Sequence, residues 1–557
     1  MKTFRPKLFD TLRSYSGKQF AADVVAGIIV AIIALPLSIA LAIASGVSPE
    51  QGLYTAIIAG FVIALFGGSR VNISGPTAAF ATIVAGVVAT HGLSGLIVAT
   101  VMAGVLLILM GLCHFGSLIK YIPTTITVGF TGGIAVTILV GQIKDFLGLT
   151  FAPGTNAIET GEKLEAIVKS IGTFNPWALL VGGIGLAILI VWPMLAKIKK
   201  LGKLAAVLGK IPPSIIAVII GILLVQFTPL NGKVNTIGTL YPTLSSAFPM
   251  PSLPSFEFET VKAVLPSAFT IAILAAIESL LSCVVSDGMI GDRHNSNTEL
   301  IAQGVGNVCS GLFGGIPATG AIARTAANVK NGGRSPIAGM VHAVVLALFL
   351  VVLMPLAKII PMPIIAAILF MVAYNMSEWR HFVHICKTAP KSDILVLVLT
   401  FALTVIFDLV VAIAVGLVLA AVLFLKRMAD VTSVRRWADA TTEVGKPIPA
   451  HTVVYEIHGP MFFADSDKFL HFDLPDDTRV LILRMGGVPA LDVTVMSNLE
   501  RLAALCRERN ISLIFAHVNP QPMAVLKKSG FDREIGEEHL VANITEALSL
   551  AETLLQR

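Results

Sequence analysis

The sequence predicts an all-α polytopic membrane protein with fourteen transmembrane segments, arranged as two inverted repeats of seven helices and followed by a small cytoplasmic α/β domain. Three observations support this fold class. The 557-residue chain is 55% hydrophobic and 13% charged, whereas soluble proteins carry about a quarter charged residues. Residues 21–426 are overwhelmingly apolar, while 427–557 have an ordinary soluble composition. A glycine-rich break, LFGG, occurs once in each half of the apolar region.

The number of spans follows from the lengths of the apolar stretches, since a bilayer-crossing helix needs about 20 residues. Ten stretches near that length begin at Asp23, Gly52, Gly92, Lys120, Trp177, Pro212, Val261, Leu300, Pro336 and Ile394, and three shorter ones begin at Pro76, Gly320 and Pro361. The run 394–425 is too long for one crossing at about 1.5 Å per residue, and we divide it at its one charge, Asp408. The total is fourteen. The alternative is twelve spans, with the short stretches as loops.

Basic residues predict the orientation, because lysine and arginine collect on the cytoplasmic side. Five of them precede the first span: Lys2, Arg5, Lys7, Arg13 and Lys18. The other clusters all follow even-numbered spans: Lys197, Lys199, Lys200, Lys203 and Lys210 after the sixth, Arg324, Lys330 and Arg334 after the tenth, and Arg380, Lys387 and Lys391 after the twelfth. Both termini are therefore expected in the cytoplasm.

The expected organisation follows from these boundaries. It comprises a cytoplasmic N-terminal segment (1–20), a first transmembrane repeat (21–229), an external loop (230–260), a second repeat (261–426), a linker (427–449) and a C-terminal domain (450–557). In that domain short apolar strands alternate with amphipathic helices, which is typical of a small α/β sheet.

The repeated break predicts the functional site. LFGGSRVNISGPTAAFA begins at Leu65 and LFGGIPATGAIARTAANV at Leu312, so the breaks lie in spans three and ten, at equivalent places in the two repeats. Each repeat has an odd number of spans, so the second repeat enters the membrane from the side opposite to the first. Helix N-termini present unpaired N–H groups and partial positive charge, and two facing ends form an anion site. The expected walls are Thr77, Ala78 and Ala79 after Pro76, and Ala321, Ile322 and Ala323 after Gly320, with Arg324 adding positive charge. The alternative is that these glycines only permit close helix packing.

One lone carboxylate indicates ion coupling. Glu278 is the only charged residue between Ala263 and Ser286, and ionisable residues inside membranes are usually functional. Ser282 lies four residues on, on the same helical face. We interpret the pair as a site that couples transport to protons or sodium. The alternative is a structural Glu278 that pairs with Arg324 or a backbone N–H. Asp23, Arg70 and Arg380 are interpreted as ordinary interfacial charges.

No catalytic or metal-binding constellation is evident, so an enzyme is not expected. The five cysteines form no CxxC motif, and no His/Cys cluster has metal-ligand spacing. We therefore expect no cofactor, no metal and no nucleic-acid partner.

The chain resembles the SulP anion transporters, the sulfate permease family. The resemblance rests on DVVAGIIVAIIALPLSIALAIASGVSPEQGLY in the first span, SGPTAAF and GGIPATGAIARTAANV at the breaks, and a tail similar to a STAS domain. It implies a core and a gate domain, an elevator-like movement of the core, and homodimers. It also implies that Leu37, Leu41, Thr77, Ala78, Ala323 and Arg324 are pocket residues and that Glu278 occupies the acidic coupling position.

Two positions depart from the family pattern. Many relatives have Pro-Gln where this chain has Pro36-Leu37, which removes a polar pocket group. In the tail, Val493 stands where bacterial antagonists carry a phosphorylatable Ser.

The segments PLSIALAIASGV, QIKDFLGL, IESLLSCVVSDGM and YNMSE resemble the C4-dicarboxylate-transporting branch. The resemblance thus implies proton-coupled uptake of succinate, fumarate or aspartate across a bacterial inner membrane, with bicarbonate and then sulfate as alternatives. A cytoplasmic protein partner of the tail is a further possibility. The other functional classes considered are an anion channel and a signalling scaffold.

Overall fold

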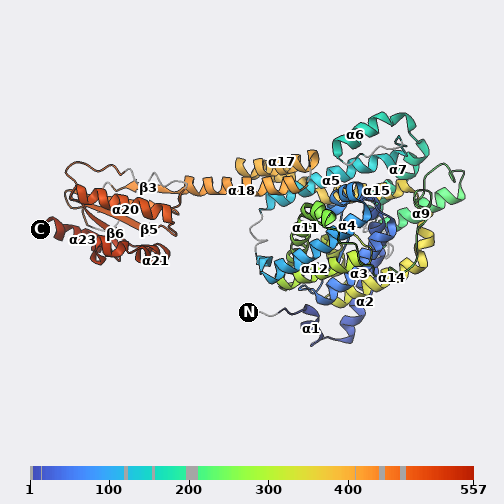
Figure 1. Ribbon diagram of the computed structural model, residues 1–557, viewed down its shortest axis with the longest axis horizontal. Coiled ribbons are helices and arrows are strands. Elements are labelled where there is room, and N and C mark those ends of the chain that lie inside the picture. The colour runs from blue at the N-terminus through green and yellow to red at the C-terminus, as the bar shows by residue number, and fades with distance from the viewer. Residues whose placement is uncertain are drawn as a thin grey trace. The chain divides into compact units, whose positions relative to one another are not determined.

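The computed structural model describes residues 4–13, 15–117, 123–152, 157, 159–195, 211–407, 409–437, 446–463 and 472–556. Several residues used in the predictions, namely Lys2, Lys197, Lys199, Lys200, Lys203, Lys210 and Asp408, lie outside these ranges. The chain divides into two compact units, residues 1–417 and 418–557, and each is described by itself (Figure 1).

The first unit is helical, as its composition predicts. Its helices up to the external loop are α1 (Lys7–Leu12), α2 (Gly17–Ala44), α3 (Pro49–Phe66), η1 (Ala78–Phe80), α4 (Ala81–Leu112), α5 (Thr124–Leu147), α6 (Thr160–Lys169), α7 (Pro176–Leu195) and α9 (Pro213–Phe227). Those that follow are α10 (Ile237–Leu240), α11 (Phe258–Ile290), α12 (Ser296–Leu312), α13 (Ile322–Lys330), α14 (Pro336–Ala357), α15 (Met362–Ser377), α16 (Trp379–Thr388), α17 (Lys391–Ile406) and α18 (Leu409–Val431), the last of which continues into the second unit.

Each of the fourteen predicted spans corresponds to a helix or half-helix among the described residues. The short stretches from Pro76 and Gly320, which the twelve-span alternative treats as loops, form η1 with the start of α4, and α13. Gly92 has a φ of +65° and kinks α4 where span three was expected to end. The long run near residue 408 is divided as predicted, because α17 ends at Ile406 and α18 begins at Leu409. Nine of the described helices are long and apolar enough to cross a membrane by length and composition.

The helices of the first unit pack into two groups. Helices α2, α3, α4, α11, α12, α13 and α14 contact one another, and α5, α7, α9, α15 and α17 form the second group (Figure 1). The first group contains both helix breaks. A close contact between α4 and α12 joins the two repeats, because a Cβ on Gly304 of α12 would lie 2.5 Å from the Gly104 carbonyl of α4, and one on Gly104 2.6 Å from the Gly304 carbonyl.

The second unit carries a five-stranded sheet in the order β3–β4–β5–β6–β7. Its elements are β3 (Ser433–Arg436), β4 (Thr452–His458), β5 (Val480–Gly487), α20 (Val493–Glu508), β6 (Ser512–Ala516), α21 (Pro520–Ser529), α22 (Phe531–Ile535), β7 (Leu540–Val541) and α23 (Ile544–Leu555). Only the β3–β4 pair is antiparallel. Strand β3 lies within the segment 427–449 that was expected to be a linker.

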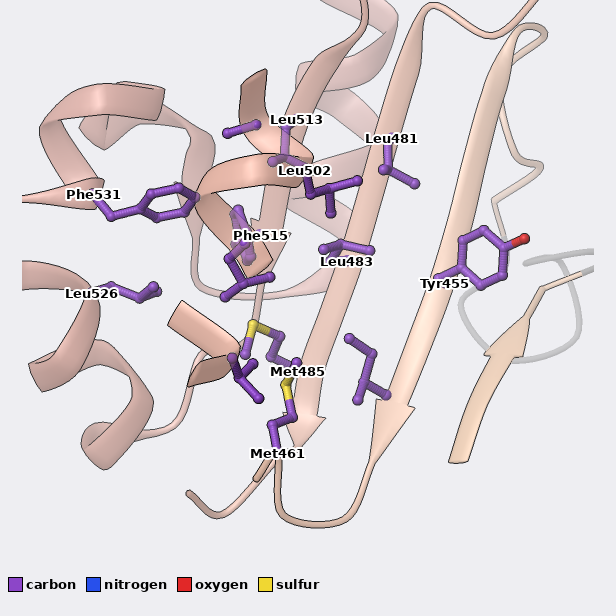
Figure 2. Close-up of a cluster of buried hydrophobic side chains, with 14 of the residues drawn as sticks. Tyr455, Met461, Leu481, Leu483, Met485, Leu502, Leu513, Phe515, Leu526 and Phe531 are labelled. Atoms are coloured by element: carbon purple, nitrogen blue, oxygen red, sulfur yellow. The ribbon is translucent and has the colours of Figure 1, made fainter. Parts of the chain in front are cut away.

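Apolar side chains cover both faces of this sheet. One face packs against α20, α21 and α22 through a cluster that includes Leu483, Leu502, Phe515, Leu526 and Phe531 (Figure 2). The other packs against α23, where Ala547 and Leu548 meet Ile482 and Ile514. Parallel strands that are buried on both faces read as continuous apolar runs, which is the pattern seen in VLILRM.

The contact between Gly104 and Gly304 generates a first prediction. Substituting Gly304→Val forces side-chain atoms into the α4 backbone, and overpacking of this kind costs on the order of 1–3 kcal/mol. We expect a lower thermal unfolding midpoint in detergent. Gly183→Val on α7 is the matched control, because a Cβ there meets nothing within 4 Å. Equal midpoints for the two variants would contradict this account of the α4–α12 contact.

Candidate functional site

The two helix breaks lie against each other. Strands β1 (Ser74–Gly75) and β2 (Thr319–Gly320) pair antiparallel, with Ser74 opposite Gly320 and Gly75 opposite Thr319. The Ala321 N–H extends the pairing by donating to the Ile73 carbonyl at 2.8 Å. Residues 244 to 248 positions apart in the sequence are thus joined directly through their backbones, and a half-helix begins just beyond each strand.

The predicted wall residues differ in their exposure. On the first break Thr77 is half-buried, whereas Ala78 and Ala79 are buried. On the second break Ala321 is buried, whereas Ile322 and Ala323 are exposed. The exposed or half-buried members are Thr77, Ile322 and Ala323.

The two leucines of α2 lie differently. Leu41 is 4% exposed and belongs to the core of the first unit. Leu37 is half-buried and packs against an apolar cluster built from α7, α9 and α15, which includes Val181, Ala217 and Ile364. Leu37 therefore contacts the second helix group while its own helix belongs to the first.

Arg324 connects the two breaks. Its Nη2 donates to the Pro76 carbonyl, and the side chain is almost fully buried at 4% exposure. A Cβ on Gly75 would lie 2.7 Å from Nη1, so a glycine is needed there for the guanidinium to fit. Arg324 thus joins the second half-helix to the first break through Nη2, while Nη1 is buried without a hydrogen-bond partner among the described residues.

Glu278 contacts the first break and not Arg324. The Thr77 hydroxyl donates to Glu278 Oε2 at 3.0 Å, which joins α11 to the start of the span-three half-helix. No lysine, arginine or histidine of the described residues lies within ion-pair distance of this carboxylate. Among the described residues, Glu278 therefore does not form the ion pair with Arg324 that the alternative interpretation requires.

Ser282 takes part in a different set of contacts. Its hydroxyl is fully buried and donates to Asn72 Oδ1 at 2.8 Å, and it lies 3.2 Å from Thr325 Oγ1. Thr325 in turn accepts from the Ile73 N–H at 2.9 Å. Ser282 thus belongs to a hydrogen-bonded network with Asn72 and Thr325 beside the breaks. Glu278, one turn earlier, contacts Thr77 instead.

Sequence reasoning missed a row of polar residues on α12. Glu299, Gln303 and Asn307 recur every four residues, so they share one helical face, and all three are fully buried. This spacing is visible in the sequence. It was overlooked because Glu299 precedes the expected start of the span at Leu300 and the amides carry no charge.

Glu299 supports the first break. Its Oε2 accepts from the backbone N–H groups of Gly68 and Ser69 at 2.8 and 3.2 Å, and its Oε1 accepts from Asn72 Nδ2 and Gln303 Nε2 at 2.8 and 3.0 Å. Four donors satisfy the carboxylate without a cation. A buried charge is stable only with such a complete set of hydrogen bonds.

The other end of the row supports the second break. Asn307 accepts from the Ala318 N–H at 2.8 Å and donates to the Ala318 carbonyl at 2.9 Å, as a neighbouring strand would. Between the two, Gln303 donates to the Ser74 hydroxyl at 3.0 Å. One helix face therefore supplies hydrogen bonds to both breaks.

The interpretation of Asp23 as an ordinary interfacial charge is wrong. Asp23 is fully buried and accepts five hydrogen bonds: from Tyr15, Gln19, the Arg334 and Ser335 N–H groups, and the Ser335 hydroxyl. Burial raises the pKa of Tyr15 to about 12, so that its hydroxyl remains a donor. Asp23 ties the start of α2 to the loop before α14.

Arg70 also has a partner. Its Nε lies 2.9 Å from Asp292 Oδ2, and Lys7 Nζ lies 3.1 Å from the same oxygen. Burial alone would raise the pKa of Asp292, but the Arg293 N–H and the two cations outweigh it and lower the pKa. The N-terminal segment is thereby attached to the loop between α11 and α12.

The α12 row generates a second prediction. Glu299→Ala leaves four buried donors unsatisfied, each at a cost of about 1–3 kcal/mol, so we expect a large fall in the yield and thermal midpoint of folded protein. Glu259→Ala, at the exposed start of α11, is the control and should change neither quantity. A Glu299→Ala protein as stable as this control would show that the carboxylate does not support the break.

Comparison with known proteins identifies the family. The model of the "Sulfate permease family" matches residues 20–400, and that of the "STAS domain" matches residues 443–547. The chain is 39% identical to the "Putative sulfate transporter YvdB" of Bacillus subtilis over 535 residues, which cover 95% of this chain and 97% of that protein. It is 30% identical to the "Bicarbonate transporter BicA" of Picosynechococcus over 531 residues, covering 90% and 89% of the two chains.

Comparison with solved structures supports the same fold. The transmembrane domain of a cyanobacterial BicA matches with a TM-score of 0.61 at 29% identity, covering 73% of this chain and 98% of that one. The structure of SLC26A9 matches with a TM-score of 0.86 at 18% identity, covering 98% and 92%, and at that identity it supports the fold alone. The chain, a multi-pass membrane protein with a C-terminal STAS domain, belongs to the sulfate permease family.

Proposed function

We propose that the protein is a secondary active transporter that carries small anions across the membrane, with the anion held between the two broken helices. The observation that carries this proposal is the β1–β2 pairing, which brings the starts of both half-helices to one place. The first N–H groups of a helix lack intrahelical partners and carry partial positive charge. Two such starts meeting inside a bilayer form an anion site of the kind found in transporters built from inverted repeats.

Bicarbonate is the substrate that the side chains of this site favour. Among the predicted wall residues that are not buried, Thr77 alone carries a hydroxyl, while Leu37 is apolar and Arg324 Nη2 donates to a carbonyl. A site with so few side-chain donors suits a singly charged anion better than a doubly charged one, whose desolvation is costlier. One relative is named a bicarbonate transporter and another a sulfate transporter, so sulfate is the runner-up. The earlier expectation of a C4-dicarboxylate rests on sequence segments alone.

Glu278 is the proposed coupling group, with the proton as the coupling ion. Its carboxylate is half-buried in α11 and receives one hydrogen bond, from Thr77, which also begins the first half-helix. A change in the protonation of Glu278 would be felt directly by the backbone that holds the anion. A coupling ion must bind two states of the protein with different affinity, and the contact between Glu278 and Thr77 is the proposed source of that difference.

The two helix groups suggest how access alternates. The group with both breaks would move as the core, and the group of α5, α7, α9, α15 and α17 would stay as the gate, in an elevator-type mechanism. Leu37 contacts the gate cluster through apolar side chains only, a contact that has no directional bonds to break when the core slides. A homodimer formed through the gate is part of this proposal.

The site predicts that Arg324→Ala strongly reduces anion uptake while the protein still inserts and purifies as folded. Loss of a charged hydrogen-bond partner costs about 1.5–3 kcal/mol, which corresponds to a roughly 10- to 100-fold fall in uptake. The measurement is proteoliposome uptake of labelled bicarbonate, sulfate and succinate, each with and without imposed proton and sodium gradients. Lys330→Ala, at the exposed end of the same helix, is the control. Normal uptake by Arg324→Ala would refute the role of the paired breaks.

The coupling proposal predicts that Glu278→Gln loses accumulation against a gradient but retains anion exchange, because the amide keeps the contact with Thr77 and cannot take up a proton. Counterflow and net uptake measured on the same proteoliposomes separate the two activities. Glu259→Gln on the same helix should retain both. Concentrative uptake that persists in Glu278→Gln with its normal pH dependence would overturn the assignment.

A further inference from the structure

Helix α16 has an amphipathic sequence that the transport proposal does not use. In WRHFVHICKT, Trp379, Val383 and Cys386 follow a helical spacing of four and three residues, and Arg380, His384 and Lys387 follow the same spacing on the adjacent side. The helix has no acidic residue and no buried residue. Trp379 and Val383 are 48% and 39% exposed. An apolar stripe beside a basic one is typical of helices that lie in a membrane interface.

The position of α16 in the chain places it at a membrane surface. It connects α15 to α17, the twelfth and thirteenth spans, with turns at both ends. Glu378 adopts a left-handed conformation with φ +41° before it, and Pro390 follows it. The distribution of basic residues predicts that this connection is cytoplasmic, where the leaflet carries anionic lipid.

The side chain of Phe382 attaches α16 to the gate helices. Phe382 packs edge-to-face on Phe401 of α17, with ring centroids 5.3 Å apart. A Cβ on Gly132 of α5 would lie 3.4 Å from Phe401 and 3.7 Å from Phe382, so the two rings pack over this glycine. Trp379, three residues before Phe382, lies beside this contact and is still 48% exposed. The exposed Arg380, His384 and Lys387 lie on the opposite side of the helix from Phe382.

We propose that α16 binds anionic phospholipid of the cytoplasmic leaflet and anchors the gate group to it. Trp379 and Val383 enter the interfacial layer, and Arg380 and Lys387 contact lipid phosphates, with Lys391 at the start of α17 extending the basic stripe. Each basic side chain near an anionic leaflet contributes about a fivefold preference. A tryptophan with an arginine over its ring, here 5.5 Å from the ring centroid, suits this layer because it has an apolar body and a charged edge. The claim about lipid binding stands without the transport proposal, and its effect on rate rests on that proposal.

The binding test uses the tryptophan itself. The full-length protein is reconstituted with brominated phosphatidylglycerol or brominated phosphatidylcholine at equal mole fraction, and Trp379 fluorescence is obtained as the difference between the wild type and Trp379→Phe. We expect severalfold stronger quenching by the phosphatidylglycerol. The Arg380→Gln/Lys387→Gln variant should be quenched equally by both lipids. Equal quenching in the wild type, or no quenching by either lipid because another copy or protein covers the helix, would overturn the proposal.

The functional test varies lipid charge. We expect the uptake rate of the wild type to rise severalfold as phosphatidylglycerol replaces phosphatidylcholine, and that of Arg380→Gln/Lys387→Gln to stay at the neutral-lipid level. Lys169→Gln/Lys262→Gln removes the same charge from exposed sites on α6 and α11 and should behave as the wild type. The same lipid dependence in both double variants would refute the anchoring role. Uptake absent from all proteins, with selective quenching intact, would count against the transport proposal and not against lipid binding.

Discussion

The structure depends on one constraint, which is that every backbone N–H and C=O group inside a bilayer must find a partner. A helix satisfies its own groups, but the stretches around Ser74 and Thr319 are not helical. Their groups are satisfied partly by each other, in the β1–β2 pair, and partly by side chains of α12. The interruption of the two helices and the pairing that satisfies the interrupted backbone are therefore one feature, and neither repeat can supply it alone.

The pairing of the two breaks also explains which residue types lie next to them. Gly75 leaves room for the Arg324 guanidinium, which uses one of its donors on the Pro76 carbonyl. The guanidinium is thus buried against the first break. An anion bound between the half-helices, as proposed, would interact with oriented N–H groups whose positions are held by buried polar residues, an arrangement that requires little reorganisation on binding.

Much of this organisation could be predicted from the sequence because it depends on length, charge and chain breakers. Apolar length predicted the spans, and Asp408 marked the division between α17 and α18 although it lies outside the described residues. The role of Asp23 could not be predicted, since its five donors come from segments more than 300 residues apart. Strand β3 was missed because a short edge strand of polar sequence resembles a linker. The row from Glu299 to Asn307 was visible, yet a search for charges inside spans passes over buried amides.

The buried acids then separate by how many donors surround them. Asp23 accepts five hydrogen bonds and Glu299 four, so each connects several segments of the chain. Glu278 accepts one, from the residue that begins the first half-helix. A carboxyl group that accepts few hydrogen bonds has few to lose when it takes up a proton. For Glu278 the hydrogen bond affected is the one from Thr77. Among the acids of the described membrane helices that contact the breaks, Glu278 therefore has the fewest hydrogen bonds to lose, which supports the coupling role proposed for it.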